Sequence, residues 1–169
     1  MEYRLTTPCT AQDLAPLRAG DTVLLSGVVY TARDQAHKRM IEALDRGEPL
    51  PFDLEGSAIY YVGPTTSGRM DAMSPRLLDL GNKIMIGKGK RDAAVKEAVV
   101  RNGAVYLAAL GGAGALMAKS VQTLEVIAWP DLGCEAVRRL TVQDMPLTVI
   151  LDAHGGDLYL EGPEAYRNR

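Results

Sequence analysis

A single turn of this sequence gathers hydroxyl groups around a guanidinium. Segment 63–71, GPTTSGRMD, follows directly on the apolar run 57–62, SAIYYV. A threonine hydroxyl becomes a base or a nucleophile only where positive charge or another base stabilises its alkoxide, and Arg69 supplies such a charge within the same turn. Thr65 and Thr66 are therefore candidates for proton transfer. A Thr-Thr pair taken alone, however, more often satisfies its own backbone through side-chain hydrogen bonds.

Three cations lie on turns beside expected strands. Arg33 stands where a strand gives way to a helix, Arg69 lies in the turn just described, and Lys88 lies between two glycines. Bidentate contacts from arginine fix planar carboxylates and lysine adds a point charge, so the three together suit a small ligand with two carboxylates. Each one alone is usually a solvated loop charge. For Arg33, either Asp34 and solvent absorb the unfavourable charge at the helix start, or the first turn and the guanidinium together face an anion.

Two glycine-rich stretches fail as nucleotide-binding signatures. Segment 111–115, GGAGA, does not have the G-x-G-x-x-G spacing. Segment 87–90, GKGK, lacks the glycine that a P-loop places before its GK pair. The sequence therefore does not indicate a nucleotide ligand, and we expect the first stretch to be a tight turn with close backbone packing.

The histidines and cysteines form no recognisable metal site. His37 falls inside an expected helix and His154 follows the last expected strand, and a lone histidine is usually a hydrogen-bonding residue. Cys9 and Cys134 are separated by most of the chain, so they give neither a CxxC pair nor a disulfide framework. This cysteine usage is typical of a reducing cytoplasm.

Composition and charge exclude several classes of protein. The chain has 169 residues, 47% hydrophobic and 24% charged, which predicts one globular domain over 1–169. With 19 basic and 21 acidic side chains the formal net charge is -2, and only one Trp and one Phe are present, so we expect no nucleic-acid partner. No apolar signal core and no run of about 18 apolar residues occurs, which predicts neither export nor a membrane span and favours a cytoplasmic location.

The elements that must position the candidate residues alternate along the chain. Runs rich in Val, Ile and Tyr alternate with helical patterns, which predicts an α/β domain. The predicted strands are 22–30, 57–62, 83–86, 104–110, 121–129 and 147–151. The predicted helices are 32–46, 74–80, 92–101 and 133–140. Polar, glycine-rich turns follow several of the strand ends, where α/β proteins commonly place a binding site.

Four segments of the chain together resemble a known family. They are SGVVYTARDQAHKR at 26–39, YVGPTTSGRMD at 61–71, IGKG at 86–89 and DAHGG at 152–156. In this order they are similar to the β subunit of the iron-sulfur hydro-lyases, the class I fumarate hydratases and L(+)-tartrate dehydratases. The resemblance covers nearly the whole chain. It implies a three-layer swivelling β/β/α domain with a mixed sheet, and either reversible hydration of fumarate to L-malate or dehydration of tartrate to oxaloacetate.

The resemblance also implies roles for four residues. Thr65 matches the base that takes the C3 proton of malate. Arg33 and Arg69 match arginines that bind the substrate carboxylates, and Lys88 matches a substrate-binding lysine. Proton removal beside a carboxylate builds negative charge on that carboxylate, so fixed cations directed at it stabilise the transition state more than the ground state.

One requirement of the resembled family is missing from this chain. Family enzymes use a [4Fe-4S] cluster whose fourth iron binds substrate as a Lewis acid. The cluster needs three cysteine thiolates, and this chain has two cysteines, neither of them in a family motif. The resemblance therefore implies a cluster-bearing α subunit that also supplies the catalytic acid, in an α2β2 hetero-oligomer with the active site at the subunit interface.

Three functions remain open at this point. Nothing in the four site residues separates a fumarate hydratase from a tartrate dehydratase. From a different class, the chain could be a carboxylate-binding or interaction domain without catalysis.

Overall fold

The computed structural model describes residues 1–63, 66–110 and 113–161. The strands are β1 Glu2–Thr6, β2 Thr22–Thr31, β3 Ala58–Tyr60, β4 Ile84–Ile86, β5 Val105–Ala108, β6 Val121–Ala128 and β7 Val137–Leu151. The α-helices are α1 Ala11–Leu14, α2 Asp34–Asp45, α3 Ser74–Asp79, α4 Ala93–Asn102 and α5 Ala113–Ser120. Two 3-10 helices are η1 Ser67–Met70 and η2 Pro130–Glu135.

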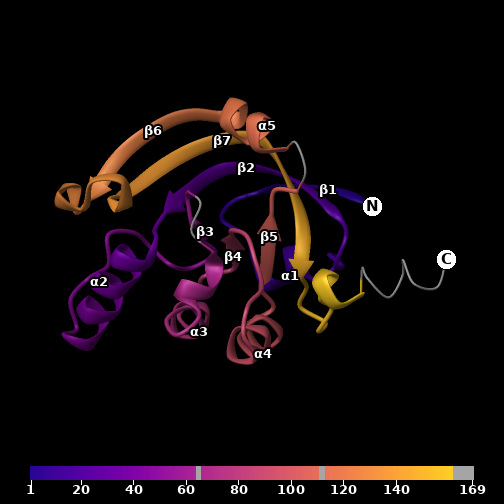
Figure 1. Ribbon diagram of the computed structural model, residues 1–169, viewed down its shortest axis with the longest axis horizontal. Helices are drawn as coiled ribbons and strands as arrows, with labels where there is room; N and C mark the ends of the chain where they lie inside the picture. The colour runs from indigo at the N-terminus through magenta and orange to yellow at the C-terminus, as the bar shows by residue number, and fades with distance from the viewer. Residues whose placement is uncertain (64–65, 111–112, 162–169) are drawn as a thin grey trace.

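The strands form one mixed sheet in the order β1-β2-β3-β4-β5-β7-β6. Strands β1 to β5 pair parallel with one another in sequence order, whereas β7 is antiparallel to β2, β5 and β6. In Figure 1 the short strand β1 and the longer strands β2, β6 and β7 form an arch over β3, β4 and β5, and α2, α3 and α4 lie on the other side. The predicted α/β class is confirmed. The finer assignment to the swivelling β/β/α type stays a prediction.

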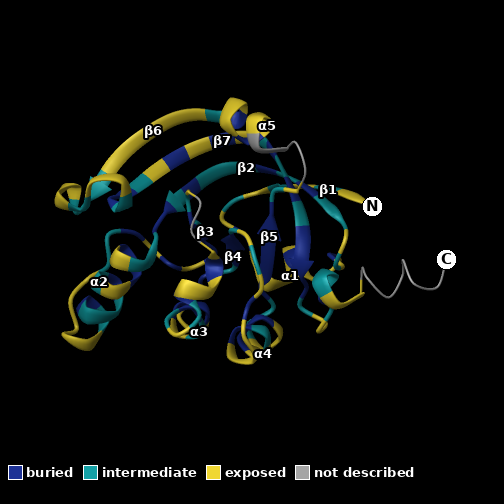
Figure 2. Cartoon of the chain, viewed as in Figure 1, coloured by how far each residue is buried: buried dark blue, intermediate teal, exposed yellow. Residues whose placement is uncertain are grey.

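Strands β3, β4 and β5 lie at the centre of the core because both of their faces are covered. Every residue of β4 and β5 is buried, as Figure 2 shows. Successive side chains point to opposite faces. Met85 and Tyr106 therefore pack among residues of α2, α3 and α4, whereas Ile84 and Leu107 pack against residues of β2 and β7. Short apolar parallel strands of this kind require cover on both faces.

The predicted helix at 133–140 is wrong. The 3-10 helix η2 ends at Glu135, and strand β7 begins at Val137. The start of β7 pairs with the end of β2, where Thr31 lies opposite Arg138, and with β6 on its other side. Pairing with the distant strand β2 and with the preceding strand β6 thus overrides the local helical preference of 133–140. The predicted strand 147–151 is the end of the same strand β7.

The other predicted elements are present, with ends that agree or are shifted by a few residues, and both ends of α4 carry caps. Asp92 caps α4 by accepting a hydrogen bond from Val95 N, and Gly103 ends it with φ 62°. Strand β1 and helices α1 and α5 were not predicted. Helix α5 begins inside the segment predicted as a turn, whose residues 111 and 112 lie outside the described ranges. Among the helices that the structure describes, none is long and apolar enough to cross a membrane.

Candidate functional site

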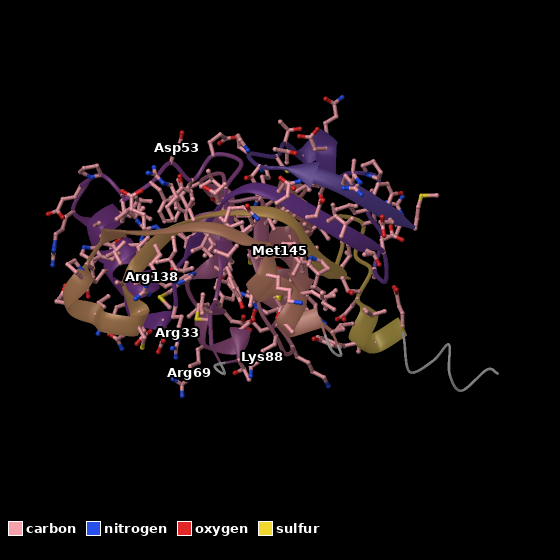
Figure 3. All side chains as sticks on the ribbon, turned by 90° about the horizontal axis from the view of Figure 1, so that it is seen from above. Arg33, Asp53, Arg69, Lys88, Arg138 and Met145 are labelled. Carbon is pink, nitrogen blue, oxygen red and sulfur yellow. The ribbon has the colours of Figure 1, made fainter. Side chains whose placement is uncertain are left out.

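The sheet register brings the candidate turns to one edge. Thr31, Tyr60 and Ile86 lie side by side at the ends of β2, β3 and β4, which are parallel neighbours. The segments that follow these three residues carry Arg33, the GPTTSGRMD turn and Lys88 respectively. Figure 3 shows Arg33, Arg69 and Lys88 along the same edge of the molecule.

The structure does not place the predicted base together with these three cations. Thr65 lies outside the residues that the structure describes.

Arg33 lies at this edge, immediately before α2. Its side chain is 18% exposed, and its Nε lies 4.0 Å from Glu135 Oε1. A Cβ added to Gly63 would lie 3.4 Å from Arg33 Nη1, so the guanidinium packs beside the start of the GPTTSGRMD turn. The first of the two sequence alternatives for Arg33 named only Asp34 and solvent as partners; the structure adds Glu135.

Arg69 is a solvent-exposed cation. Its side chain is 63% exposed, and its Nη1 lies 3.6 Å from Asp34 Oδ2. An ion pair that exposed contributes at most about 1 kcal/mol to stability. The guanidinium therefore remains available to an external carboxylate.

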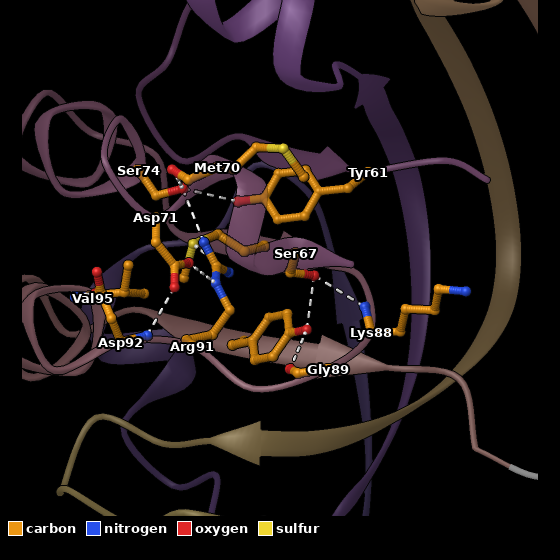
Figure 4. Close-up of polar contacts among 12 residues, drawn as sticks. Tyr61, Ser67, Met70, Asp71, Ser74, Lys88, Gly89, Arg91, Asp92 and Val95 are labelled. Atoms are coloured by element: carbon orange, nitrogen blue, oxygen red, sulfur yellow. Dashed lines mark hydrogen bonds and ion pairs between the residues drawn. The ribbon is translucent and has the colours of Figure 1, made fainter. Parts of the chain in front are cut away.

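Lys88 is held through its backbone rather than its side chain. Lys88 N donates to Ser67 Oγ at 2.9 Å, and Ser67 N donates to the Lys88 carbonyl oxygen at 2.9 Å. In Figure 4 the Lys88 side chain points away from Ser67. Lys88 lines a cavity of about 160 Å³, together with Gly63 and Tyr61. The two turns are thus joined, with the lysine side chain left free of that junction.

A buried ion pair that sequence reasoning missed supports both turns. The Arg91 side chain is 0% exposed, and its Nε donates to Asp71 Oδ1 at 2.6 Å. Its Nη2 donates to Ser74 Oγ at 2.9 Å (Figure 4). The guanidinium carbon lies 5.3 Å from the ring centroid of Tyr61 and 4.8 Å from that of Tyr106. Arg91 therefore ties the end of the GPTTSGRMD turn to the end of the GKGKRD segment.

Tyr106 completes this support from β5. Its hydroxyl lies 2.8 Å from Ser67 Oγ and 3.0 Å from the Gly89 carbonyl oxygen. Burial raises the pKa of Tyr106, so the hydroxyl keeps its proton and can donate. The turn that carries Lys88 is therefore stabilised by the neutral hydroxyl of Tyr106 and by the charged guanidinium of Arg91.

The two histidines have backbone-supporting positions. His37 is fully buried, burial lowers its pKa to about 4, and its Nδ1 lies 2.8 Å from the Arg33 carbonyl oxygen. The imidazole is therefore neutral near pH 7, and its contact with the carbonyl oxygen stabilises the backbone of Arg33. His154 Nε2 lies 2.7 Å from the Ala15 carbonyl oxygen. Because β7 is antiparallel to β5, the DAHGG segment lies at the opposite edge of the sheet, away from the candidate site.

A pair of carboxyl groups lies beside the arginines. A hydrogen bond with Glu135 is the main reason that the pKa of Asp34 is lowered, with smaller contributions from Arg69 and Arg33. Burial, followed by the contact with Asp34, raises the pKa of Glu135. Sequence reasoning did not mark Glu135, because it lies far along the chain from the other site residues.

The side chains of this chain do not fit a [4Fe-4S] cluster. The sequence contains two cysteines where the cluster needs three thiolates. Cys9 is buried, donates to the Thr6 carbonyl oxygen at 3.4 Å, and has a pKa raised by burial to about 11. Such a thiol stays protonated and is a poor metal ligand. Within 1–63, 66–110 and 113–161, no group of three or more His, Cys, Asp or Glu side chains is arranged to hold a metal ion.

Gly87→Ala should destabilise the protein by about 1–3 kcal/mol, the cost of overpacking. A Cβ at Gly87 would overlap Ser67 Oγ and lie 2.8 Å from Tyr61 Cδ2, so the two joined turns would have to separate. Gly68→Ala is the matched control, because among the described residues its Cβ would meet nothing closer than Lys90 O at 3.8 Å. Urea unfolding of both variants measures the difference, and equal midpoints would contradict the close packing at Gly87.

Comparison with known proteins gives a consistent set of relatives. The family described as Fumarase C-terminus matches residues 1–162. Fumarate hydratase 2 of Leishmania major is 37% identical over an alignment length of 168, which covers 88% of this chain and 29% of that protein. The putative L(+)-tartrate dehydratase subunit beta of Methanocaldococcus jannaschii is 39% identical over an alignment length of 181, which covers 95% of this chain and 92% of that subunit.

A third relative extends the same pattern. The L(+)-tartrate dehydratase subunit beta of Escherichia coli is 34% identical over an alignment length of 188, which covers 100% of this chain and 92% of that subunit. The chain therefore spans less than a third of the Leishmania fumarate hydratase and nearly the whole length of the two tartrate dehydratase subunits.

Proposed function

Since this chain belongs to the fumarase C-terminus family, we propose that it is the β part of a two-part hydro-lyase that reversibly hydrates fumarate to L-malate. The observation that carries this proposal is the meeting of three cations, Arg33, Arg69 and Lys88, at one edge of the sheet beside the GPTTSGRMD turn. A small dianion is the ligand that such a set suits best.

Dehydration of L(+)-tartrate is the second candidate, and a specific observation favours it. The relatives that the chain matches over 92% of their length carry the name L(+)-tartrate dehydratase subunit beta. Both substrates present two carboxylates, so the three cations serve either reaction equally.

In either reaction we assign this chain's residues the tasks of binding and of moving one proton. Arg33 and Arg69 hold the two carboxylates, and Lys88 adds a charge from the neighbouring turn. Thr65 takes the proton from the carbon next to one carboxylate. The arginines act on the charge that develops there, in a site whose donors are already in place before substrate binds.

The rest of the active site belongs to a partner in this proposal. The cluster and the catalytic acid lie on an α subunit, because the donor set of this chain does not fit the cluster. The exposed Arg69 leaves the site open at the edge where that subunit would close it. An α2β2 assembly, a cytoplasmic location, a single domain over 1–169 and the swivelling β/β/α type complete the proposal.

Reconstitution tests this assignment. Each subunit is purified alone without oxygen, and fumarate hydration and tartrate dehydration are measured before and after mixing with the cysteine-bearing α subunit. We expect turnover from the mixture and none from this chain by itself. The ratio of L-malate to L-tartrate turnover decides between the two substrates.

Two outcomes of this reconstitution oppose the proposal. Full activity from this chain by itself would refute the shared site. A stable complex that binds dicarboxylates but turns over neither would favour the non-catalytic domain.

A further inference from the structure

The carboxyl pair beside the arginines has no task in the proposed reaction. Asp34 and Glu135 come from positions far apart in the sequence, and their side chains are 25% and 20% exposed. Placing two acids next to the cations of an anion site weakens the positive field there unless one acid keeps a proton. Their contacts indicate what they do instead.

Glu135 stabilises the start of α2 from outside the helix. The residue before α2 is Arg33, whose side chain has no acceptor and so cannot cap the first N–H groups. Glu135 Oε1 accepts from Gln35 N at 3.3 Å and so supplies that acceptor. The same oxygen lies 4.0 Å from Arg33 Nε. One carboxyl group thus contacts both the helix start and the guanidinium in front of it.

Asp34 connects this arrangement to the second arginine. Its Oδ2 lies 3.6 Å from Arg69 Nη1. Its Oδ1 is buried and, apart from the Glu135 carboxyl, has no hydrogen-bond donor in the described part of the chain. A buried acceptor without a donor is costly, and a proton held by the adjacent Glu135 carboxyl removes that cost. The raised pKa of Glu135 and the lowered pKa of Asp34 agree with this location of the proton.

The shared proton also matches the charge of the ligand. Arg33, Arg69 and Lys88 carry three positive charges, and a pair that shares one proton carries one negative charge. The excess of two positive charges balances a dicarboxylate. Among the described residues, other charged or titratable groups near the pair include the buried His37, whose pKa the Asp34 charge influences, Arg138, which donates to the Gly133 and Cys134 carbonyl oxygens, and the exposed Cys134 thiol.

We propose that Glu135 is a positioning residue of the dicarboxylate site, which acts through Asp34 to hold Arg33 and Arg69 in their binding arrangement. The inference rests on the proposed function, because it assigns Glu135 to the same site. It adds a residue from η2, which connects β6 to β7, to a site otherwise built from the ends of β2, β3 and β4.

A purely structural role for Glu135 predicts a different behaviour, and the chain offers a control. Arg39 of α2 binds Asp131 of η2 through two hydrogen bonds of 3.0 and 2.6 Å, and its guanidinium lies 5.9 Å from the Trp129 ring. Asp131→Ala therefore loosens the same contact between η2 and α2 without touching Asp34 or Arg33. If attachment of η2 were all that mattered, Asp131→Ala and Glu135→Ala would act alike.

The experiment measures kcat and KM for the dicarboxylate in the complex with the α subunit, over a pH series above the ordinary carboxyl range. In the wild type, KM should rise as pH passes the raised pKa of Glu135, because the site then loses one unit of positive charge. Glu135→Ala should raise KM roughly tenfold with little change in kcat. Glu135→Gln keeps a side-chain acceptor and a donor, so it should restore KM and abolish its pH dependence. Asp131→Ala should leave KM unchanged.

The outcomes separate this inference from the function beneath it. A wild-type complex that turns over neither diacid overturns the proposed function, and this inference with it. An active wild-type complex in which Glu135→Ala leaves KM unaltered, or in which Asp131→Ala raises KM as much, overturns this inference alone. Should Glu135→Ala fail to assemble with its partner, a wild-type pH profile in Glu135→Gln would still refute the proposal.

Discussion

Arg91→Met should lower the free energy of unfolding by about 3–5 kcal/mol, the usual cost of removing one partner from a buried ion pair. The Arg91 side chain is 0% exposed and the Asp71 side chain 12% exposed, so the substitution leaves a carboxylate out of water without its counter-charge. Of the hydrogen bonds that the described residues make to Asp71, the one from Asp92 N to Oδ2, at 2.8 Å, would remain. Urea unfolding of this chain gives the value directly.

An exposed ion pair nearby provides the control for that value. Arg101 binds Asp79 through two hydrogen bonds of 3.0 Å, but the two side chains are 53% and 47% exposed. Arg101→Met should therefore cost no more than about 1 kcal/mol. Similar losses of unfolding free energy in Arg91→Met and Arg101→Met would show that burial does not increase the contribution of the Arg91–Asp71 pair to stability.

Thr65→Ala should reduce kcat of the assembled enzyme by about 10²- to 10⁴-fold, the range in which loss of a general base falls. The reason is chemical: alanine offers no oxygen to receive the proton from the carbon beside the carboxylate. KM should change little, because in this proposal the carboxylates are held by Arg33, Arg69 and Lys88. Exchange of the substrate C3 proton with deuterated solvent provides a second measurement of the same step.

Two variants separate the chemistry of Thr65 from its place in the turn. Thr65→Ser keeps the hydroxyl and should restore much of the lost turnover. Thr66→Ala changes the next residue, an exposed position that precedes η1 without a side-chain capping bond to the described residues. It should leave kcat close to the wild-type value. Near-normal turnover in Thr65→Ala would remove this residue from the base role.

The part of the site that sequence could predict is the part built from neighbouring parallel strands. Polar turns after such strands must meet at one edge, which is why Arg33, Arg69 and Lys88 were expected together and are found so. The family resemblance, carried by the same turns, is confirmed by the match over 1–162. Their roles toward a substrate stay predictions.

The part that could not be predicted depends on packing between distant segments. In sequence, Arg91 is one more cation after GKGK, and only the rings of Tyr61 and Tyr106 and the carboxylate of Asp71 make it a buried support. Glu135 falls in the segment that was wrongly predicted as a helix. Glu135 reaches the site because η2 leads directly into β7. The pairing of β7 with β2 and β6 is not specified by any local sequence pattern.

The position of β7 late in the chain has a consequence for biosynthesis. Strands β2 and β5 leave the ribosome long before β7, yet each takes β7 as an antiparallel partner. Until β7 is translated, both strands have an unpaired edge, and such edges are where nascent chains aggregate. Pairing between segments so far apart in sequence also closes slowly. The newly made polypeptide should therefore depend on chaperones during the interval before its last long strand emerges.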